Sequence, residues 1–345
     1  MNAPNNWPAL LTVLLNGENL TPEQAAWAMQ TIMTGEATDV QIAGFAVALR
    51  AKGVTPIELA AFAQVMVQHA TPMPQFPDAV DIVGTGGDQA GTANISTMAA
   101  VVIAAAGVPV VKHGNRAASS LCGSADLLEE LGVAIDLMPE GVVKSVEEAG
   151  IGFCFAPRFH TGYRHAAVVR RALGVPTVFN FLGPLTNPAQ PQAGAIGCAD
   201  VRMAPIMAGA LAARGASALV LRGHDGLDEF TLTGPTEVWA VSEGSVRQFA
   251  VTPADIGVSE APIEALKGGD ASVNARIARE VFEGTPSPIS DAVIANAAAA
   301  LVAYHRFAAD ADIVTLWRQQ VDAARNVVAS GAPAKVLERW VVATR

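Results

Sequence analysis

Cysteines and basic residues are scarce in this chain. It has 3 cysteines in 345 residues, Cys122, Cys154 and Cys198, and no C-x-x-C spacing joins them. A small, odd number without that spacing argues against a disulfide framework or a zinc site and favours reduced thiols in a cytoplasmic protein. The 22 Lys and Arg residues are outnumbered by 32 Asp and Glu residues, which gives a net charge of −10. This balance disfavours nonspecific binding to nucleic acid, because phosphate backbones must be neutralised.

Long apolar segments are also missing. Residues 1–8 have neither a basic region nor an apolar core, so the sequence predicts no signal peptide. The longest apolar run, residues 98–111, is interrupted by Gly107 and Pro109 and is too short to cross a bilayer. We therefore expect no membrane partner. The chain also has no internal repeats and no low-complexity tracts.

The length and the apolar content indicate two lobes. A chain of 345 residues is longer than one compact core usually contains, and 51% hydrophobic residues suffice for a large interior. Threonine-led capping patterns at residues 21–24, 38–41 and 55–58 each open an apolar-periodic run. They predict a small unit of short helices. Residues 71–77 are rich in proline and mark a linker.

The pattern changes to alternating strands and helices from Val80 onward. Short apolar strands are predicted at residues 80–83, 108–111, 151–155, 193–198 and 218–221. Such runs are typical of a parallel sheet covered on both faces. A hairpin at residues 237–251 and four further helices at residues 272–283, 290–307, 313–330 and 334–342 complete the chain. The sequence therefore predicts an α/β fold, in which ligands bind at the carboxyl ends of the strands.

A glycine-rich loop follows the first predicted strand. Gly84, Gly86 and Gly87 lie close together ahead of Asp88, and glycine lets a ligand approach bare N–H groups. The stretch lacks both the G-x-G-x-x-G and the G-K-[ST] fingerprint, and a single loop of this kind is more often a tight turn. The segment that comes next opens a helix, whose N-terminus favours anions; its residues are Asn94, Ile95, Ser96 and Thr97.

A second cluster of donors comes at the end of the next predicted strand. It consists of Lys112, His113, Gly114, Asn115, Arg116, Ala117, Ala118, Ser119 and Ser120. Two strand ends and a helix start would therefore meet at one edge of the sheet. Such a density of donors favours a site for a compound that carries several phosphates.

These segments resemble the signature segments of the anthranilate phosphoribosyltransferase family. The similarity covers residues 84–88, 94–97, 112–120, 170–174, 179–188 and 225–229. It runs in register over nearly the whole chain. The resemblance implies that anthranilate attacks phosphoribosyl pyrophosphate (PRPP) to give phosphoribosyl anthranilate and pyrophosphate, a step of tryptophan biosynthesis.

The resemblance also implies an architecture. A small N-terminal helical domain would be joined to a larger α/β domain with a mainly parallel central sheet, as in nucleoside phosphorylases. We expect the helical domain to contain residues 1–72 and 166–190, and the α/β domain residues 73–165 and 191–345. The family further implies a homodimer formed through the N-terminal helices.

Departure of pyrophosphate needs stabilisation of negative charge, and Mg²⁺ is the cofactor that the resemblance implies. Asp228 and Glu229 follow a strand-end loop, although an isolated acidic pair is more often exposed and structural. In the family the serine that corresponds to Ser96 also binds the metal. The metal ligands expected are thus Ser96, Asp228 and Glu229.

Individual roles follow from the residue types and from the family. Lys112 is expected to supply a mobile positive charge, and Asp88 to orient the ribose or a water. The resemblance assigns the acceptor amine to Asn115 and its carboxylate to Arg170, with Arg171 a competing choice. The full set expected to bind substrate is Gly84, Gly86, Gly87, Asp88, Thr92, Asn94, Ile95, Ser96, Thr97, Lys112, His113, Gly114, Asn115, Arg116, Ala117, Ala118, Ser119, Ser120, Ser124 and Arg170.

Several points stay open from the sequence. His113 and His160 are either pocket walls or structural histidines, and no general base is evident. The family commonly has proline after the position of His160, whereas this chain has Thr161 and Gly162, which predicts a more mobile loop. Two other functions compete: a pyrimidine nucleoside phosphorylase, which would use inorganic phosphate without Mg²⁺, and a non-catalytic relative that binds nucleic acid.

Overall fold

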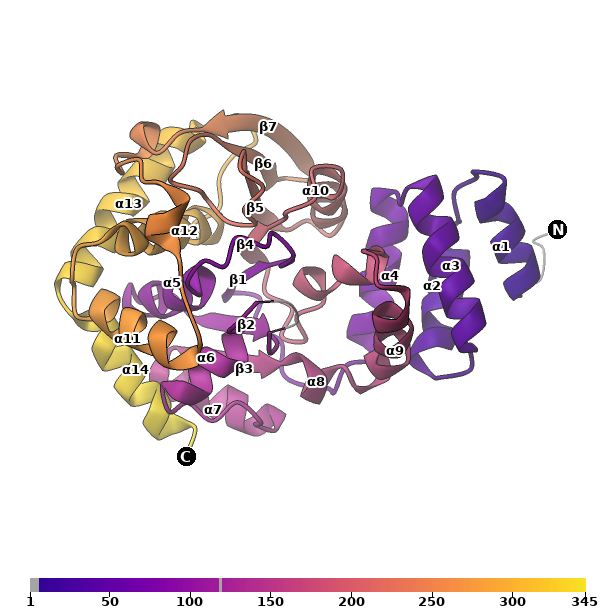
Figure 1. Ribbon diagram of the computed structural model, residues 1–345, viewed down its shortest axis with the longest axis horizontal. Coiled ribbons are helices and arrows are strands. Elements are labelled where there is room, and N and C mark those ends of the chain that lie inside the picture. Colours follow the sequence, from indigo (N-terminus) through magenta and orange to yellow (C-terminus); the bar gives the residue numbers. More distant parts are fainter. Residues whose placement is uncertain (1–5, 118–119) are drawn as a thin grey trace.

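The computed structural model describes residues 6–117 and 120–345 and shows two lobes joined side by side (Figure 1). The N-terminal helices form the smaller lobe. The larger lobe is built around a seven-stranded sheet. The predicted fold class, a helical unit beside an α/β unit, is confirmed.

Four helices open the chain. They are α1 (Trp7–Leu15), α2 (Pro22–Met33), α3 (Asp39–Lys52) and α4 (Pro56–Gln68). The three predicted capping boxes are present. The hydroxyls of Thr21, Thr38 and Thr55 each accept the backbone N–H three residues on, and the backbone N–H of each threonine donates to the side-chain oxygen of that same residue. These caps satisfy amides that the first helical turn leaves without partners. The sequence had not delimited α1.

A connecting segment returns from the sheet to the helical lobe. It contains α8 (Ala156–Phe159), η1 (Thr161–Tyr163), α9 (Arg164–Leu173), η2 (Val178–Asn180) and η3 (Gly183–Leu185). Helix α9 packs against α2 and α3, and its buried Ala166 and Val169 join the core of the N-terminal helices. This packing supports the predicted division of the chain, whose boundaries stay a prediction.

The sheet has the strand order β3-β2-β1-β4-β5-β6-β7. The first five strands are parallel, and the last two form the predicted antiparallel hairpin. The strands are β1 (Val80–Gly84), β2 (Val110–Gly114), β3 (Ile151–Phe155), β4 (Ala193–Gly197), β5 (Ser217–Gly223), β6 (Thr236–Ser242) and β7 (Ser245–Val251).

The order of the strands reverses between β1 and β4. After β1 the chain adds β2 and β3 on one side, and it then returns to add β4 on the other. The register pairs Gly84 with Gly197, so the carboxyl ends of these two strands lie side by side. A reversal of this kind opens a crevice at the carboxyl edge, where ligands of α/β sheets bind.

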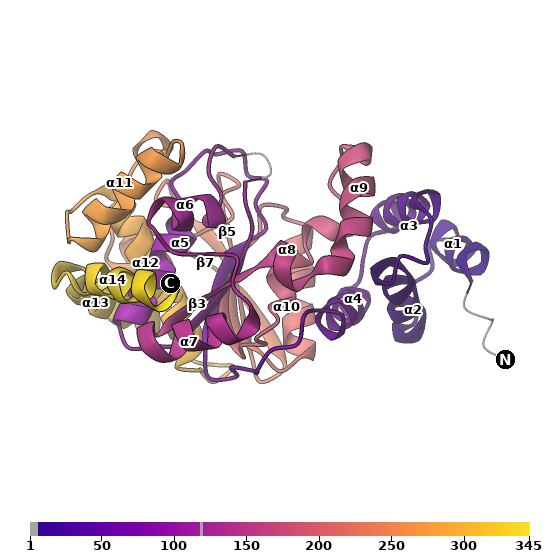
Figure 2. The same cartoon turned by 90° about the horizontal axis from the view of Figure 1, so that it is seen from below.

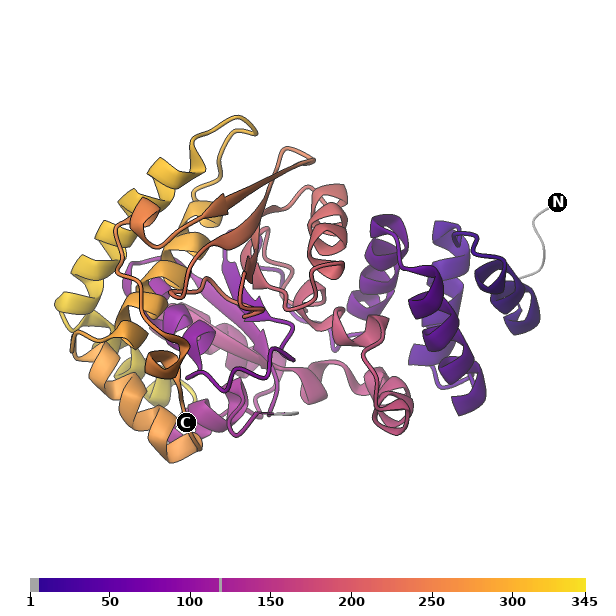
Figure 3. The same ribbon diagram turned by 45° about the horizontal axis from the view of Figure 1, so that its top comes forward.

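Helices cover both faces of the sheet. Those on the face away from the helical lobe include α5 (Ile95–Ala105), α12 (Pro288–Tyr304), α13 (Ile313–Ala329) and α14 (Ala332–Ala343), of which the C-terminal ones run from orange to yellow in Figure 3. Helix α10 (Met203–Ala213) packs on the opposite face and shares its core with the helical lobe. The remaining helices are α6 (Ser124–Glu130), α7 (Pro139–Ala149), α11 (Ala271–Phe282), η4 (Ala254–Ile256) and η5 (Ile263–Leu266).

The predicted bounds of the second strand were wrong. The sequence placed the strand at residues 108–111, with the donor cluster after it, but β2 begins at Val110 and includes Lys112 and His113. Proline at position 109 has no N–H for the ladder, which delays the start of pairing. The side chains of Lys112 and His113 lie in the interior, where they contact the carbonyls of Ile82 and Gly183. These partners could not be identified from the sequence of the strand itself.

No helix in the part of the chain that the structure describes is long and apolar enough to cross a bilayer. All three cysteines are buried and unpaired. Burial raises the pKa of the Cys198 thiol to about 12. This agrees with the expected reduced, structural thiols.

Candidate active site

Asp228 occupies the crevice between β1 and β4. A Cβ added to Gly84 would lie 2.2 Å from Oδ2 of Asp228, and one added to Gly197 would lie 1.5 Å from its carbonyl oxygen. Two adjacent strands therefore end in glycine because the acid needs the space. The side chain is only 8% exposed, so its carboxylate is fixed at the point where the strand order reverses.

The glycine-rich loop wraps around this carboxylate. Gly86 and Gly87 have φ values of 68° and 87°, a region that favours glycine. The N–H of Gly86 donates to Oδ2 of Asp228 at 2.6 Å. Asp88 accepts the N–H of Ala90 at 3.1 Å, which is a turn contact. The structure thus brings the predicted loop and the predicted metal residue into direct contact.

Burial leaves both adjacent carboxylates poorly solvated. Burial and then the nearby charge of Asp88 raise the pKa of Asp228 to about 7. Burial and then the charge of Asp228 raise the pKa of Glu229 well above its usual value. The Oε2 atom of Glu229 is buried and has no hydrogen-bond partner. An unpaired acceptor beside a second carboxylate is an arrangement that a bound cation would stabilise.

These oxygens fit a hard divalent cation such as Mg²⁺. Among residues 6–117 and 120–345, no group of three or more His, Cys, Asp or Glu side chains could hold a metal ion on its own. Mg²⁺ commonly takes one or two carboxylates and completes its shell with water and phosphate oxygens. The pair Asp228 and Glu229 matches that partial set.

The start of α5 contributes a backbone donor rather than the expected row of side chains. The N–H of Ser96 donates to Oε1 of Glu229 at 3.0 Å, so two of the predicted metal residues do meet. Ile95 is fully buried in the core, and its N–H donates to Ala93 O, which leaves it no free donor. Thr97 is also buried, and its hydroxyl has no partner.

Asn94 braces the site in place of the predicted donation to a ligand. Its Nδ2 donates to the carbonyl of Cys122 at 3.0 Å, and its Oδ1 accepts Nδ2 of Asn274 at 2.8 Å. These contacts connect the start of α5 to the second loop and to α11. Thr92 forms an isolated antiparallel bridge with Lys267, which supports the glycine-rich loop from the other side.

The prediction of a mobile charge at Lys112 was wrong. This side chain is 1% exposed, and its Nζ donates to the carbonyl of Ile82 at 2.5 Å. Burial lowers its pKa, and the charges of Asp81, Glu229 and Asp228 oppose that shift. Lys112 is thus fixed in the interior, where the charges of Glu229 and Asp228 favour its protonated form.

Asp81 is the partner that the sequence did not assign. Burial raises its pKa to about 6, against the attraction of Lys112. Its carboxylate accepts Nδ2 of Asn187 at 2.8 Å and the N–H of His113 at 3.3 Å. An acid inside an apolar strand was the available signal, because a buried charge needs partners. This network holds β1, β2 and the loop at Asn187 together.

Arg116 also departs from its predicted role. Its guanidinium bonds Asp126 and Glu129 of α6 and lies over the ring of Phe155. Asp126 in turn accepts the N–H groups of Ala117 and Gly123, at 3.0 and 2.8 Å, and so closes the loop on itself. The Arg116 side chain therefore shapes the second loop and does not face the carboxylate pair.

The other residues of this loop remain available or lie at its ends. Asn115 is exposed, although its Oδ1 accepts the N–H of Arg116 at 2.7 Å. The hydroxyl of Ser120 donates to Cys122 O at 3.3 Å. Gly114 ends β2 and Ser124 begins α6. The predicted residues Ala118 and Ser119 lie outside the described part of the chain.

His113 and His160 form a buried pair with ring centroids 5.1 Å apart. Nδ1 of His113 is 3.1 Å from the carbonyl of Gly183, while Nε2 of both rings is buried without a partner. Burial lowers the pKa of His113 to about 3 and that of His160 to about 4. The rings are therefore neutral near pH 7.

This pair predicts acid sensitivity. In the unfolded chain His160 takes up a proton below about pH 6.5, whereas in the folded chain it does not until near pH 4. The stability due to the neutral His160 is therefore present above pH 6.5 and is lost as the pH falls. Between pH 7 and pH 4, wild type should lose on the order of 3 kcal/mol relative to His160→Gln. Urea unfolding across this range measures the difference, with His224→Gln at an exposed position as control; parallel pH profiles for wild type and His160→Gln would contradict the expectation.

Arg170 lies in the last turn of α9 and is half-buried. Figure 2 shows α9 on the helical lobe, on the same side of the molecule as the loops that follow β1 and β2. Nη1 of Arg170 donates to the hydroxyl of Tyr163 at 3.3 Å. Within the described residues, no hydrogen bond joins Arg170 to the loops at the strand ends. The structure therefore does not join Arg170 to the other predicted site residues.

Comparison with known proteins assigns the family. A model described as "Glycosyl transferase family, helical bundle domain" matches residues 8–70, and one described as "Glycosyl transferase family, a/b domain" matches residues 76–334. An anthranilate phosphoribosyltransferase of Salinispora arenicola is 57% identical over 97% of this chain and 96% of that relative. The chain belongs to the anthranilate phosphoribosyltransferase family. It is thus a glycosyltransferase-type enzyme.

Solved structures of anthranilate phosphoribosyltransferases share the whole fold. That of the Thermus thermophilus enzyme has a TM-score of 0.90 and 44% identity, covering 97% of this chain and 99% of that one. A Saccharomyces cerevisiae enzyme described as a complex with PRPP and Mg has a TM-score of 0.87 and 27% identity, covering 99% and 98%. The family assignment favours the predicted transferase over a nucleoside phosphorylase or a nucleic-acid-binding relative.

Proposed function

We propose that this chain transfers the phosphoribosyl group of PRPP to anthranilate at the carboxyl edge of the sheet, with Mg²⁺ held by Asp228 and Glu229. The main support for the proposal is the position of Asp228, which packs directly against Gly84 and Gly197 where the strand order reverses. The relatives named above support both substrates. The saccharomycete enzyme has been described with PRPP and Mg and also with 4-fluoroanthranilate.

The chain's own residues supply most of what such a transfer needs. The amides of Gly87 and Asp88 in the glycine-rich loop would donate to an incoming diphosphate, since the N–H groups of Gly86 and Ser96 bind Asp228 and Glu229. A bound Mg²⁺ would neutralise charge that develops on the departing diphosphate. Lys112, held by the carbonyl of Ile82, would in its protonated form add a positive charge at a fixed position. Positioning and charge stabilisation can account for the rate without a general base.

In this proposal the acceptor binds between Arg170 of α9 and Asn115 of the loop after β2. Arg170 pairs with the carboxylate of anthranilate through its planar guanidinium, and Asn115 holds the amine. Both groups are accessible in part, since Asn115 is exposed and Arg170 half-buried. Attack on the sugar carbon then takes place between the two lobes.

Gly84→Ala tests whether the position of the Asp228 carboxylate against Gly84 matters for activity. The added methyl would meet Oδ2 of Asp228 at 2.2 Å and push the carboxylate away from its place. We expect kcat/KM for PRPP to fall by about tenfold to a hundredfold, because displacements near 1 Å have effects of that size. Gly44→Ala in α3 is the control, since its methyl would find only ordinary contacts at 3.8 Å. Equal activity of the two variants in steady-state assays would contradict a requirement for Asp228 at this position.

The direct test of the function is a fluorescence assay. Protein, anthranilate, PRPP and Mg²⁺ are mixed, and loss of anthranilate fluorescence is followed. We expect turnover that stops when EDTA removes the metal. Turnover of a pyrimidine nucleoside with inorganic phosphate, independent of Mg²⁺, would instead support a phosphorylase.

We also propose a homodimer formed through the N-terminal helices, in the cytoplasm. Large apolar side chains stand exposed there, including Leu15 at 77% and Val40 at 81%. Val47 and Ile57 on the same helices are exposed as well, and such groups could be covered by a second copy of the chain. A monomer in sedimentation equilibrium at micromolar concentration would contradict the dimer.

A further inference from the structure

The turn before α9 is docked, although the sequence predicted a mobile loop. Residues Thr161–Tyr163 form the 3-10 turn η1. A Cβ added to Gly162 would lie 2.6 Å from the carbonyl oxygen of Met33, at the end of α2. Gly35 makes an equally close approach to the ring of His165, with its Cβ position 2.7 Å away. Glycine on both sides of this contact lets the turn sit directly on α2.

Tyr163 stands at the end of that docked turn and links two groups. Its hydroxyl donates to the carbonyl of Phe179 at 2.8 Å and accepts Nη1 of Arg170 at 3.3 Å. The rings of Tyr163 and Phe179 meet edge-on, with centroids 6.3 Å apart and planes at 71°. Burial raises the pKa of the Tyr163 hydroxyl, which therefore stays protonated and can donate.

The acceptor of that bond is itself held. Phe179 lies in η2, which is capped by Thr177 and Asn180: the N–H of Thr177 donates to Oδ1 of Asn180 at 3.0 Å, and the N–H of Asn180 donates to Thr177 O at 3.0 Å. The carbonyl of Phe179 thus comes from a short, fixed turn. The hydroxyl of Tyr163 transfers that fixed position to the guanidinium of Arg170.

We propose that Tyr163 is a positioning residue for the acceptor site, acting through Arg170. The inference depends on the proposed function, in which Arg170 pairs with the carboxylate of anthranilate. A free arginine side chain loses much rotational freedom when it binds a ligand. A guanidinium already held at Nη1 loses less, and its other N–H groups remain in one plane for the carboxylate.

Tyr163→Phe tests the hydroxyl and keeps the ring. We expect KM for anthranilate to rise about five- to tenfold, the size of effect of one hydrogen bond, while kcat and KM for PRPP change by less than about twofold. The matched control is Tyr304→Phe, at the end of α12 and the one other tyrosine of the chain. A purely structural role would affect both substrates or the melting temperature.

A double substitution decides whether the effect passes through Arg170. In the Arg170→Ala background, Tyr163→Phe should change KM for anthranilate by less than about twofold, because the group it positions is gone. A full effect in that background, or no effect in wild type, would overturn the inference. If Arg170→Ala itself leaves KM for anthranilate unchanged, the proposed acceptor site fails first, and that result is distinguishable from failure of Tyr163 alone.

Discussion

Replacing Asp228 with Asn and Glu229 with Gln together should lower kcat/KM by at least about a thousandfold and should not destabilise the protein. The amides keep the shape of the carboxylates and lose the charge that would bind the cation. Burial raises the pKa of both acids, so their ionised forms are unfavourable in the folded protein without metal. The variant should therefore unfold at the same temperature as wild type or at a higher one.

The control for this experiment is another adjacent acidic pair. Glu147 and Glu148 lie exposed on α7, and their replacement by glutamine should leave both activity and stability unchanged. Steady-state assays in Mg²⁺ and calorimetric melting of the three proteins give the comparison. Activity retained in the double variant would show that the carboxylates hold no essential metal.

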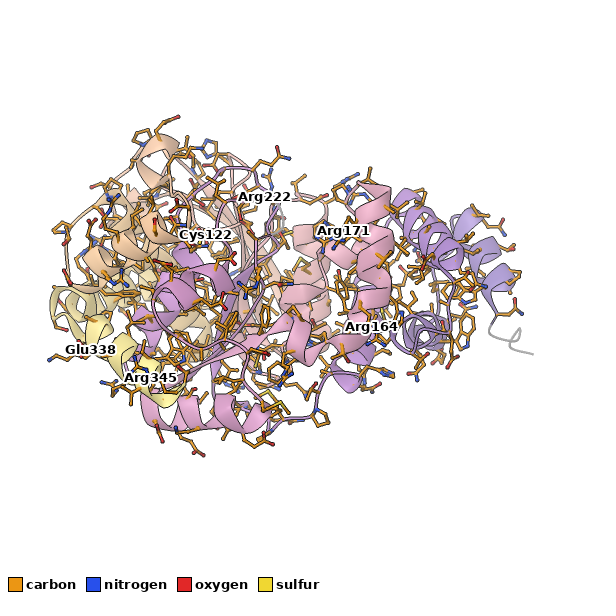
Figure 4. All side chains as sticks on the ribbon, turned by 60° about the horizontal axis from the view of Figure 1, so that its bottom comes forward. Cys122, Arg164, Arg171, Arg222, Glu338 and Arg345 are labelled. Carbon is orange, nitrogen blue, oxygen red and sulfur yellow. The ribbon has the colours of Figure 1, made fainter. Side chains whose placement is uncertain are left out.

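Arg170→Ala should lower kcat/KM for anthranilate by about a thousandfold while KM for PRPP stays within about threefold. Removing the guanidinium leaves the carboxylate of the acceptor without its proposed partner. Its neighbour Arg171 is the matched control, because it is the same residue type, one position on and exposed. Figure 4 labels Arg164 and Arg171, which mark the two ends of α9.

Comparing Arg170→Ala with Arg171→Ala separates the effect of the arginine's position from the effect of losing one positive charge. Arg171→Ala should change either parameter by less than about twofold, since an exposed charge contributes little. Equal losses for both substrates in Arg170→Ala, or a larger loss in Arg171→Ala, would remove Arg170 from the carboxylate role. Initial rates with each substrate varied in turn give kcat/KM for anthranilate and KM for PRPP in both variants.

The sequence predicted the fold well because its local signals agree with the packing. The capping boxes at Thr21, Thr38 and Thr55 and the strand at Ile151–Phe155 were identified from local chemistry and are present as predicted. Apolar strands between helices also indicated a parallel sheet. These features depend on neighbours in the chain, which the sequence contains directly.

The chemical surroundings of individual site residues could not be predicted in this way. Lys112 looked like a mobile donor, but its burial depends on Ile82 and Asp81, some 30 positions away. Arg116 looked free until α6 supplied its two acids. Gly197 had no signal at all, because its need for glycine arises from Asp228 on another loop. Contacts between distant segments decide which donors remain for a ligand.

The most direct measurement is a crystal structure of the protein with PRPP and Mn²⁺, with the metal located by anomalous scattering. The account predicts a Mn²⁺ peak coordinated by the carboxylates of Asp228 and Glu229, and a diphosphate against the amides of residues 84–88. A metal peak elsewhere, or a diphosphate bound away from that loop, would contradict it.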